Sequence, residues 1–100
     1  MQEPLTDEGR FETPNASRYL QQLCKHFSHK TEVRFDTHSG QATLPGGPAT
    51  LTATDAELIV MLKADTTEGL DRSRRVIDSH LERFAFREAF KTMDWSQFKE

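Results

Sequence analysis

Histidine, arginine and tyrosine side chains give this sequence its clearest capacity for chemistry, and they gather in residues 16–30 and 78–88. The side chains concerned are Tyr19, His26, His80, Arg83 and Arg87. Arginine binds carboxylate or phosphate through two parallel hydrogen bonds, and a histidine beside it can donate or exchange a proton near neutral pH. If these side chains meet, they form a groove suited to an anionic ligand.

Both segments have the apolar spacing of amphipathic helices, which decides whether those side chains can meet. A helix turns by about 100° per residue, so Tyr19 and His26 share one edge of the first apolar stripe. On the second helix His80 and Arg87 lie on one flank of the stripe, and Arg83 lies slightly nearer to solvent. We therefore expect a ligand-binding groove where the two helix edges face each other across a sheet.

A purely structural interpretation of the same residues stays open. Arg83 could pair with an acidic neighbour such as Glu82, and His80 could bond a backbone carbonyl. In that case the side chains would hold the helices in place and leave no groove for a ligand.

A metal site is the second interpretation of the histidines. His26 and His29 are three residues apart on the first helix, and His80 or Cys24 would add ligands that zinc or iron accepts. However, no second closely spaced ligand pair follows in the sequence. A lone cysteine is also typical of a small apolar core residue, and it fits a reducing compartment. The alternative to the anion groove is therefore a small metal-binding protein that uses these four side chains.

The motifs of common catalytic loops are absent from the sequence, among them G-x-S-x-G and G-x-x-x-x-G-K-[ST]. A histidine and two arginines define no reaction by themselves, so we expect a binding or accessory module more than an enzyme, with no cofactor identified. A third interpretation is a structural dimerisation domain with an apolar interface between two copies. The residues of that interface would be Phe86, Phe90, Trp95 and Phe98.

The elements that must position these side chains are short strands between two helices. Helices are expected at residues 15–29 and 67–90, and strands at 9–13, 31–36, 40–44, 49–53 and 57–62. The turns between the last four strands have only a few residues, which is too short for parallel crossovers. The predicted fold class is α+β, a two-layer sandwich in the order β-α-β-β-β-β-α. Its antiparallel meander sheet of four or five strands is covered by two helices.

Both helices have sequence signals at their starts. Asn15 is the expected N-cap of the first helix, where its side-chain oxygen would accept from an unpaired amide of the first turn. Residues 65–68, with the sequence Asp-Thr-Thr-Glu, are typical of a capping box at the start of the second helix.

Length and charge limit the domain organisation and the partners. The 100 residues suit one core, so we expect a flexible N-terminus at 1–8, one α+β domain at 9–92 and a tail at 93–100. A net charge of -3 argues against nucleic-acid and anionic-membrane partners. The acidic start and the lack of a long apolar run predict a soluble, cytoplasmic protein.

Two stretches resemble the signature segments of a bacterial domain-of-unknown-function family, DUF2218. They are Ala16–Lys30 and Asp78–Glu88. Members of that family are similar in length and element order, and they occur alone or as extensions of flavoproteins that reduce ferric siderophores. The resemblance implies an accessory role in siderophore iron utilisation, with a flavin-dependent siderophore reductase as a partner, and homodimerisation stays open. It implies no activity for the domain itself. Because no flavin-binding region is recognised in the sequence, we do not expect this chain to perform the reduction alone.

Overall fold

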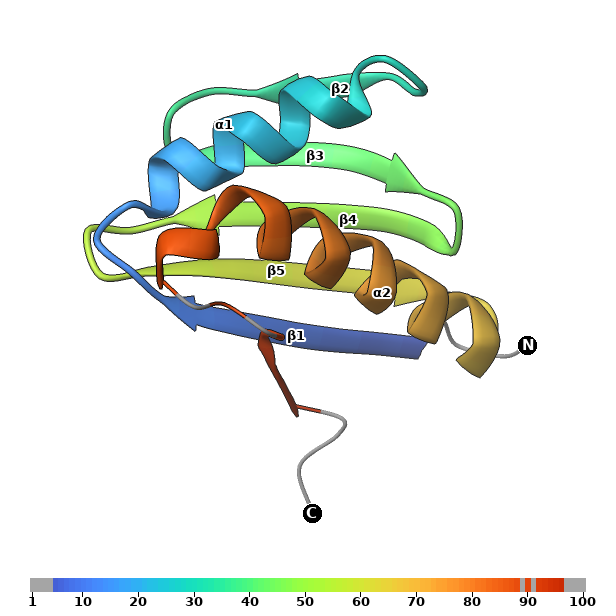
Figure 1. Ribbon diagram of the computed structural model, residues 1–100. Helices are drawn as coiled ribbons and strands as arrows, with labels where there is room; N and C mark the ends of the chain where they lie inside the picture. Colours follow the sequence, from blue (N-terminus) through green and yellow to red (C-terminus); the bar gives the residue numbers. More distant parts are fainter. Residues whose placement is uncertain (1–4, 89, 91, 97–100) are drawn as a thin grey trace.

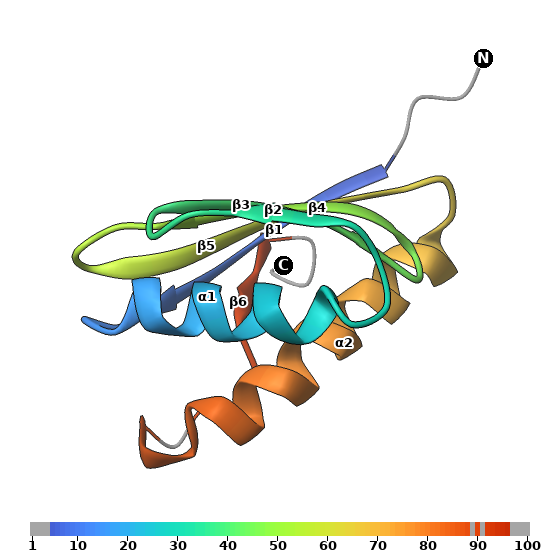
Figure 2. The ribbon, with the colours of Figure 1, turned by 90° about the horizontal axis from the view of Figure 1, so that it is seen from above.

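The computed structural model describes residues 5–88, 90 and 92–96, in which two helices cover one face of an antiparallel sheet (Figures 1 and 2). The six strands lie in the order β2-β3-β4-β5-β1-β6. The elements are β1 (Leu5–Glu12), α1 (Ala16–Phe27), β2 (Val33–Phe35), β3 (Ser39–Leu44), β4 (Gly47–Ala53), β5 (Glu57–Ala64), α2 (Thr67–Phe84), the 3-10 helix η1 (Phe86–Glu88) and β6 (Asp94–Trp95). The predicted α+β class is confirmed, with one strand more than the predicted range.

Strand β1 begins at Leu5, four residues before the predicted strand, and pairs with β5 along its whole length. The flexible segment expected at residues 1–8 therefore overlaps the sheet, while residues 1–4 lie outside the described residues. Apolar alternation did not reveal this start, because the buried positions of β1 near it are Asp7 and Gly9. Asp7 is buried in an ion pair with Arg74 of α2, which no local pattern indicates.

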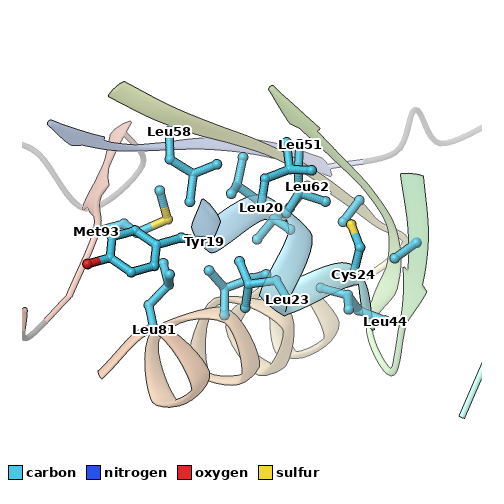
Figure 3. Close-up of a cluster of buried hydrophobic side chains, with 14 of the residues drawn as sticks. Tyr19, Leu20, Leu23, Cys24, Leu44, Leu51, Leu58, Leu62, Leu81 and Met93 are labelled. Atoms are coloured by element: carbon cyan, nitrogen blue, oxygen red, sulfur yellow. The ribbon is translucent and has the colours of Figure 1, made fainter. Parts of the chain in front are cut away.

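Helix α1 is built from the predicted stripe, and its buried residues include Leu20, Leu23 and Cys24. These side chains pack against the inner face of the sheet in one apolar core (Figure 3). The predicted side-chain cap at Asn15 is wrong, because Asn15 makes no such bond. Its Nδ2 instead donates to Glu88 Oε2 at 3.3 Å, so Asn15 ties the start of α1 to η1.

Helix α2 ends at Phe84, six residues before the predicted end. At its start Thr66 accepts from the backbone N–H of Gly69 at 2.9 Å. Because Gly69, and not Glu68, holds the position that reaches back in a capping box, only the threonine half of the predicted box is formed. After the fully buried Ala85, the chain tightens into η1, which carries Phe86 and Arg87 off the flank of α2.

The C-terminal segment packs onto the domain through β6, which pairs with β1. Trp95 is 3% exposed and lies over Gly9, where an added Cβ would be 2.6 Å from the indole ring. Phe90 is also buried in the chain's own core, and Phe98 lies outside the described residues. Phe90 and Trp95 are therefore not available for the apolar interface predicted for a dimer, and Phe86 is the one large apolar side chain of that set left exposed among the residues described.

No helix in the described part of the chain is both long and apolar enough to cross a membrane.

Candidate anion-binding site

The facing edges of α1 and α2 meet at His26 and His80, whose ring centroids are 4.3 Å apart. Both rings also lie near Phe84, at centroid distances of 6.4 Å from His26 and 6.3 Å from His80. The helical spacing placed these edges opposite each other, and packing on a common sheet face brings them into contact.

His80 is held by the backbone of its own helix, because its Nδ1 lies 2.6 Å from the carbonyl oxygen of Val76. A carbonyl oxygen only accepts, so Nδ1 carries a hydrogen in this contact. The structural interpretation of His80 is therefore correct for one ring nitrogen. For His26, burial lowers the pKa, and the neighbouring charges of His80, Lys30, His29 and Arg83 lower it further.

One turn further along the two helices, a hollow of about 290 Å³ opens between α1, the end of α2 and η1. We call it the arginine hollow. Its lining residues are Arg18, Tyr19, Gln22, Arg83, Phe84, Phe86 and Arg87. Three guanidinium groups thus share one hollow with aromatic rings and one amide, and no acidic side chain is among the lining residues.

No acidic side chain in the described part of the chain forms an ion pair with these three arginines. Among the residues described, Arg18, Arg83 and Arg87 form no ion pair, so the pairing of Arg83 with Glu82 considered above is not made. By contrast, Arg10 pairs with Glu57 at 3.0 Å and Arg75 with Asp71 at 2.9 Å. The arginine hollow is therefore a local positive site on a chain of net charge -3.

The floor of the hollow is fixed by a contact between Tyr19 and Glu88. The Tyr19 hydroxyl donates a short hydrogen bond to Glu88 Oε2, and Thr13 Oγ1 donates to Oε1 at 2.7 Å. Burial raises the pKa of Tyr19, and the Glu88 carboxylate raises it further. Burial also raises the pKa of Glu88, but hydrogen bonds from Tyr19, Thr13 and Asn15 outweigh that effect and leave it below the ordinary value. This cluster clamps η1 onto α1 and so positions the arginines on either side.

The structure divides the five predicted ligand-binding residues into two neighbouring groups. Tyr19, Arg83 and Arg87 line the hollow, with the Tyr19 hydroxyl already committed to Glu88, whereas His26 and His80 lie beyond Phe84 and do not line it. Residues that sequence reasoning missed are Arg18, Gln22, Phe84 and Phe86.

Some of the missed residues left a signal in the sequence. Arg18 and Gln22 are four residues apart and therefore share a helix face, which could have placed both beside the groove. Phe86 gave no such signal, because its position depends on the break after α2. The buried Oε1 of Gln22 has no hydrogen-bond partner in the described part of the chain, so this amide gains from any rearrangement that supplies one.

The four predicted metal ligands are not brought together. Cys24 lies in the core against Gly40, where an added Cβ would be 2.7 Å from its Sγ, and burial raises its pKa to about 11. Within residues 5–88, 90 and 92–96, no three histidine, cysteine, aspartate or glutamate side chains gather as metal ligands would. His26 and His80 are thus in contact without the further ligands that the metal interpretation requires.

Two depressions are much larger than the arginine hollow but offer weaker chemistry. One, of about 460 Å³, lies on the uncovered face of the sheet and mixes Glu32 with Arg34 and Lys63. The other, of about 470 Å³, lies along α1 beside the arginine hollow and shares Arg18 and Gln22 with it. Size therefore does not select the candidate site, whereas the concentration of unpaired guanidinium groups does.

The region of this chain that is similar to known proteins includes α1, α2 and η1, which form the hollow. The model of DUF2218, an uncharacterised protein family conserved in bacteria, matches residues 8–96. The NMR structure of PA4090 from Pseudomonas aeruginosa is similar with a TM-score of 0.76 and 25% sequence identity. The aligned region covers 95% of this chain and 98% of that one. No curated protein matches the chain.

Proposed function

The chain belongs to the uncharacterised bacterial family DUF2218, and from that premise we propose that it is a small accessory module that binds an anion in the arginine hollow. The observation that carries the proposal is the presence of Arg18, Arg83 and Arg87 around one hollow without an acidic partner.

Like charges gathered in this way repel one another, and a bound anion would relieve that repulsion. Each guanidinium offers several N–H donors in a planar fork that matches the oxygens of a carboxylate or phosphate. A hydrogen bond to a charged group contributes about 1.5–3 kcal/mol. Two or three such contacts would support binding in the micromolar to millimolar range once the entropy lost on association is subtracted.

The Tyr19–Glu88 contact supports the same proposal, because it keeps η1 in place without help from a ligand. Arg87 follows Phe86 on η1, whereas Arg18 and Arg83 project from two helices. Binding would therefore order the arginine side chains and not the backbone, which lowers the entropic cost.

We propose a siderophore-type iron chelate as the physiological ligand. The alternative is that the module docks on a flavin-dependent siderophore reductase. This step is supported by the occurrence of family members as extensions of flavoproteins that reduce ferric siderophores. It is also supported by the anionic character of such chelates. The family context suggests the pathway in which the module acts, whereas the arginine hollow indicates the chemical class of its ligand.

The test is a titration of ¹⁵N-labelled protein with citrate, followed by chemical-shift changes and by calorimetry. Arg83→Ala and Arg87→Ala should each weaken citrate binding by about tenfold, since about 1.4 kcal/mol is tenfold in affinity, and the double variant should abolish it. Arg34→Ala is the matched control, because Arg34 lines the depression on the uncovered sheet face and should leave the affinity unchanged. Undiminished binding by a folded double variant, or equal loss in Arg34→Ala, would refute the proposal.

A further inference from the structure

Phe86 has the most exposed large apolar side chain among the described residues, at 67% of its surface, and it lines the arginine hollow. The next most exposed, Met61, is at 41% and lies on the sheet face away from the helices. A single exposed apolar side chain is ordinary on a protein surface. An exposed ring at the rim of a positive hollow is more specific, since it offers a flat surface beside the charges.

The position of this ring is set by the fold. Ala85, the first residue after α2, is fully buried, so the side chains of Phe84 and Phe86 lie on either side of an anchored residue. Two residues further on, Glu88 is tied to Tyr19 of α1 and to Thr13, which precedes that helix. Phe86 is thus held between two fixed points with its side chain toward solvent.

Positive charge and aromatic surface are interleaved at this rim. The guanidinium carbon of Arg87 lies 5.7 Å from the centre of the Phe86 ring, within the range of a cation–π contact. Phe84 lines the same hollow and is partly buried against the core. A ligand that carries both a negative charge and a flat ring would contact the guanidinium forks through its oxygens and Phe86 through its ring face.

We infer that the ligand is an aromatic anion, of the aryl carboxylate class. This inference rests on the proposed function, because the carboxylate is to be held by the same arginines. It adds that the ring of the ligand stacks on Phe86, so that the module selects aryl carboxylates over aliphatic ones of equal charge. Offset or edge-to-face pairing of two rings adds to the burial of their apolar surface and favours a flat ligand.

The experiment compares benzoate, cyclohexanecarboxylate and acetate in parallel titrations of the full chain. Benzoate should bind about 3- to 10-fold more tightly than cyclohexanecarboxylate, the range that ring pairing provides beyond area burial. In Phe86→Leu the ratio of benzoate affinity to cyclohexanecarboxylate affinity should fall to about one, the range of ring pairing being lost with the ring. Phe35→Leu is the matched control, because Phe35 is a half-exposed phenylalanine on β2, and it should keep the preference.

The two levels of the proposal fail in different ways. If acetate and citrate bind through the arginines but benzoate shows no advantage, or keeps it in Phe86→Leu, the inference is overturned and the anion site stands. If no carboxylate binds, both are overturned. Sedimentation of the wild-type protein gives an independent check: a dimer that Phe86→Leu dissociates would assign the ring to self-association and overturn the inference.

Discussion

The indole Nε1 of Trp95 lies 3.0 Å from Asp78 Oδ2 and 3.2 Å from Oδ1, so one carboxylate of α2 holds strand β6 against the sheet. The backbone N–H of Met93 and the hydroxyl of Thr92 donate to the same carboxylate at 2.9 and 2.7 Å. Thr92 and Met93 lie on either side of the expected boundary between the domain and the tail, and both donate to Asp78. The structure therefore shows no break at this boundary. Asp78 therefore joins the C-terminal segment to the domain.

We predict that Asp78→Ala destabilises the protein by about 2–4 kcal/mol, because removal of a charged acceptor leaves the partly buried donors of Trp95 and Met93 unsatisfied. Trp95 is the sole tryptophan, so its fluorescence during urea unfolding reports on the segment directly. Asp71→Ala is the control: Asp71 pairs on the surface with Arg75, and its loss should cost less than about 0.5 kcal/mol. Equal losses in the two variants would contradict the role assigned to Asp78.

A second prediction concerns the buried ion pair between Asp7 and Arg74, whose Oδ2 and Nε are 2.5 Å apart. Arg74→Met removes this cation from the buried Asp7 carboxylate and should cost about 3–5 kcal/mol. The double variant Asp7→Leu/Arg74→Met should be more stable than Arg74→Met alone, because it removes the buried carboxylate as well. Chemical denaturation of the two single variants and the double variant measures this coupling, and strictly additive losses would rule it out.

The third prediction is that Cys24 is unreactive in the folded protein. Burial raises its pKa to about 11, and the thiolate is the form that attacks a disulfide reagent. At pH 8 the folded chain should react with Ellman's reagent roughly 100-fold more slowly than the chain in urea. Rapid stoichiometric labelling of protein shown to be folded would mean that the thiol is accessible and the assigned core position is incorrect.

The fourth prediction is that anion binding strengthens as the pH falls. The pKa of His26 lies below its ordinary value, owing to burial and to the positive charges of His80, Lys30, His29 and Arg83. Near pH 7 its ring is therefore neutral, and it gains a proton only as the pH drops through that lowered pKa. The added charge beside Arg83 attracts an anion, and a bound anion in turn raises the pKa of His26.

Sulfate is the probe for this effect, because it stays a dianion between about pH 7.5 and about pH 5, so any change in affinity comes from the protein. The wild-type protein should bind sulfate several-fold more tightly at the lower pH, and His26→Ala should lose most of that gain. His38→Ala is a suitable control, since His38 lies in the β2–β3 turn near Asp36. A pH profile that is the same in His26→Ala and wild type would show that His26 does not influence anion binding in the hollow.

Much of the fold follows from patterns that are local in the chain. The helical spacing in residues 16–27 and the alternation in β3, β4 and β5 are dictated by backbone geometry, which repeats every 3.6 or every two residues. Those periods also placed His26 and His80 on helix edges that could face each other. The sequence alone therefore determined the fold class, and it predicted that histidine and arginine side chains lie on facing edges of the two helices.

The rest depends on partners that are distant in the chain. Asp7 lies in a strand because Arg74, 67 residues later, neutralises it, and Phe86 points to solvent because Glu88 is bound by Tyr19, 69 residues earlier. The end of α2 at Phe84 places η1 opposite α1, so Arg18 lines the hollow while His26 and His80 lie beside it. The tertiary structure decided these points, because charge neutralisation and the packing around a buried residue depend on which surfaces meet and not on the spacing of residues along one element.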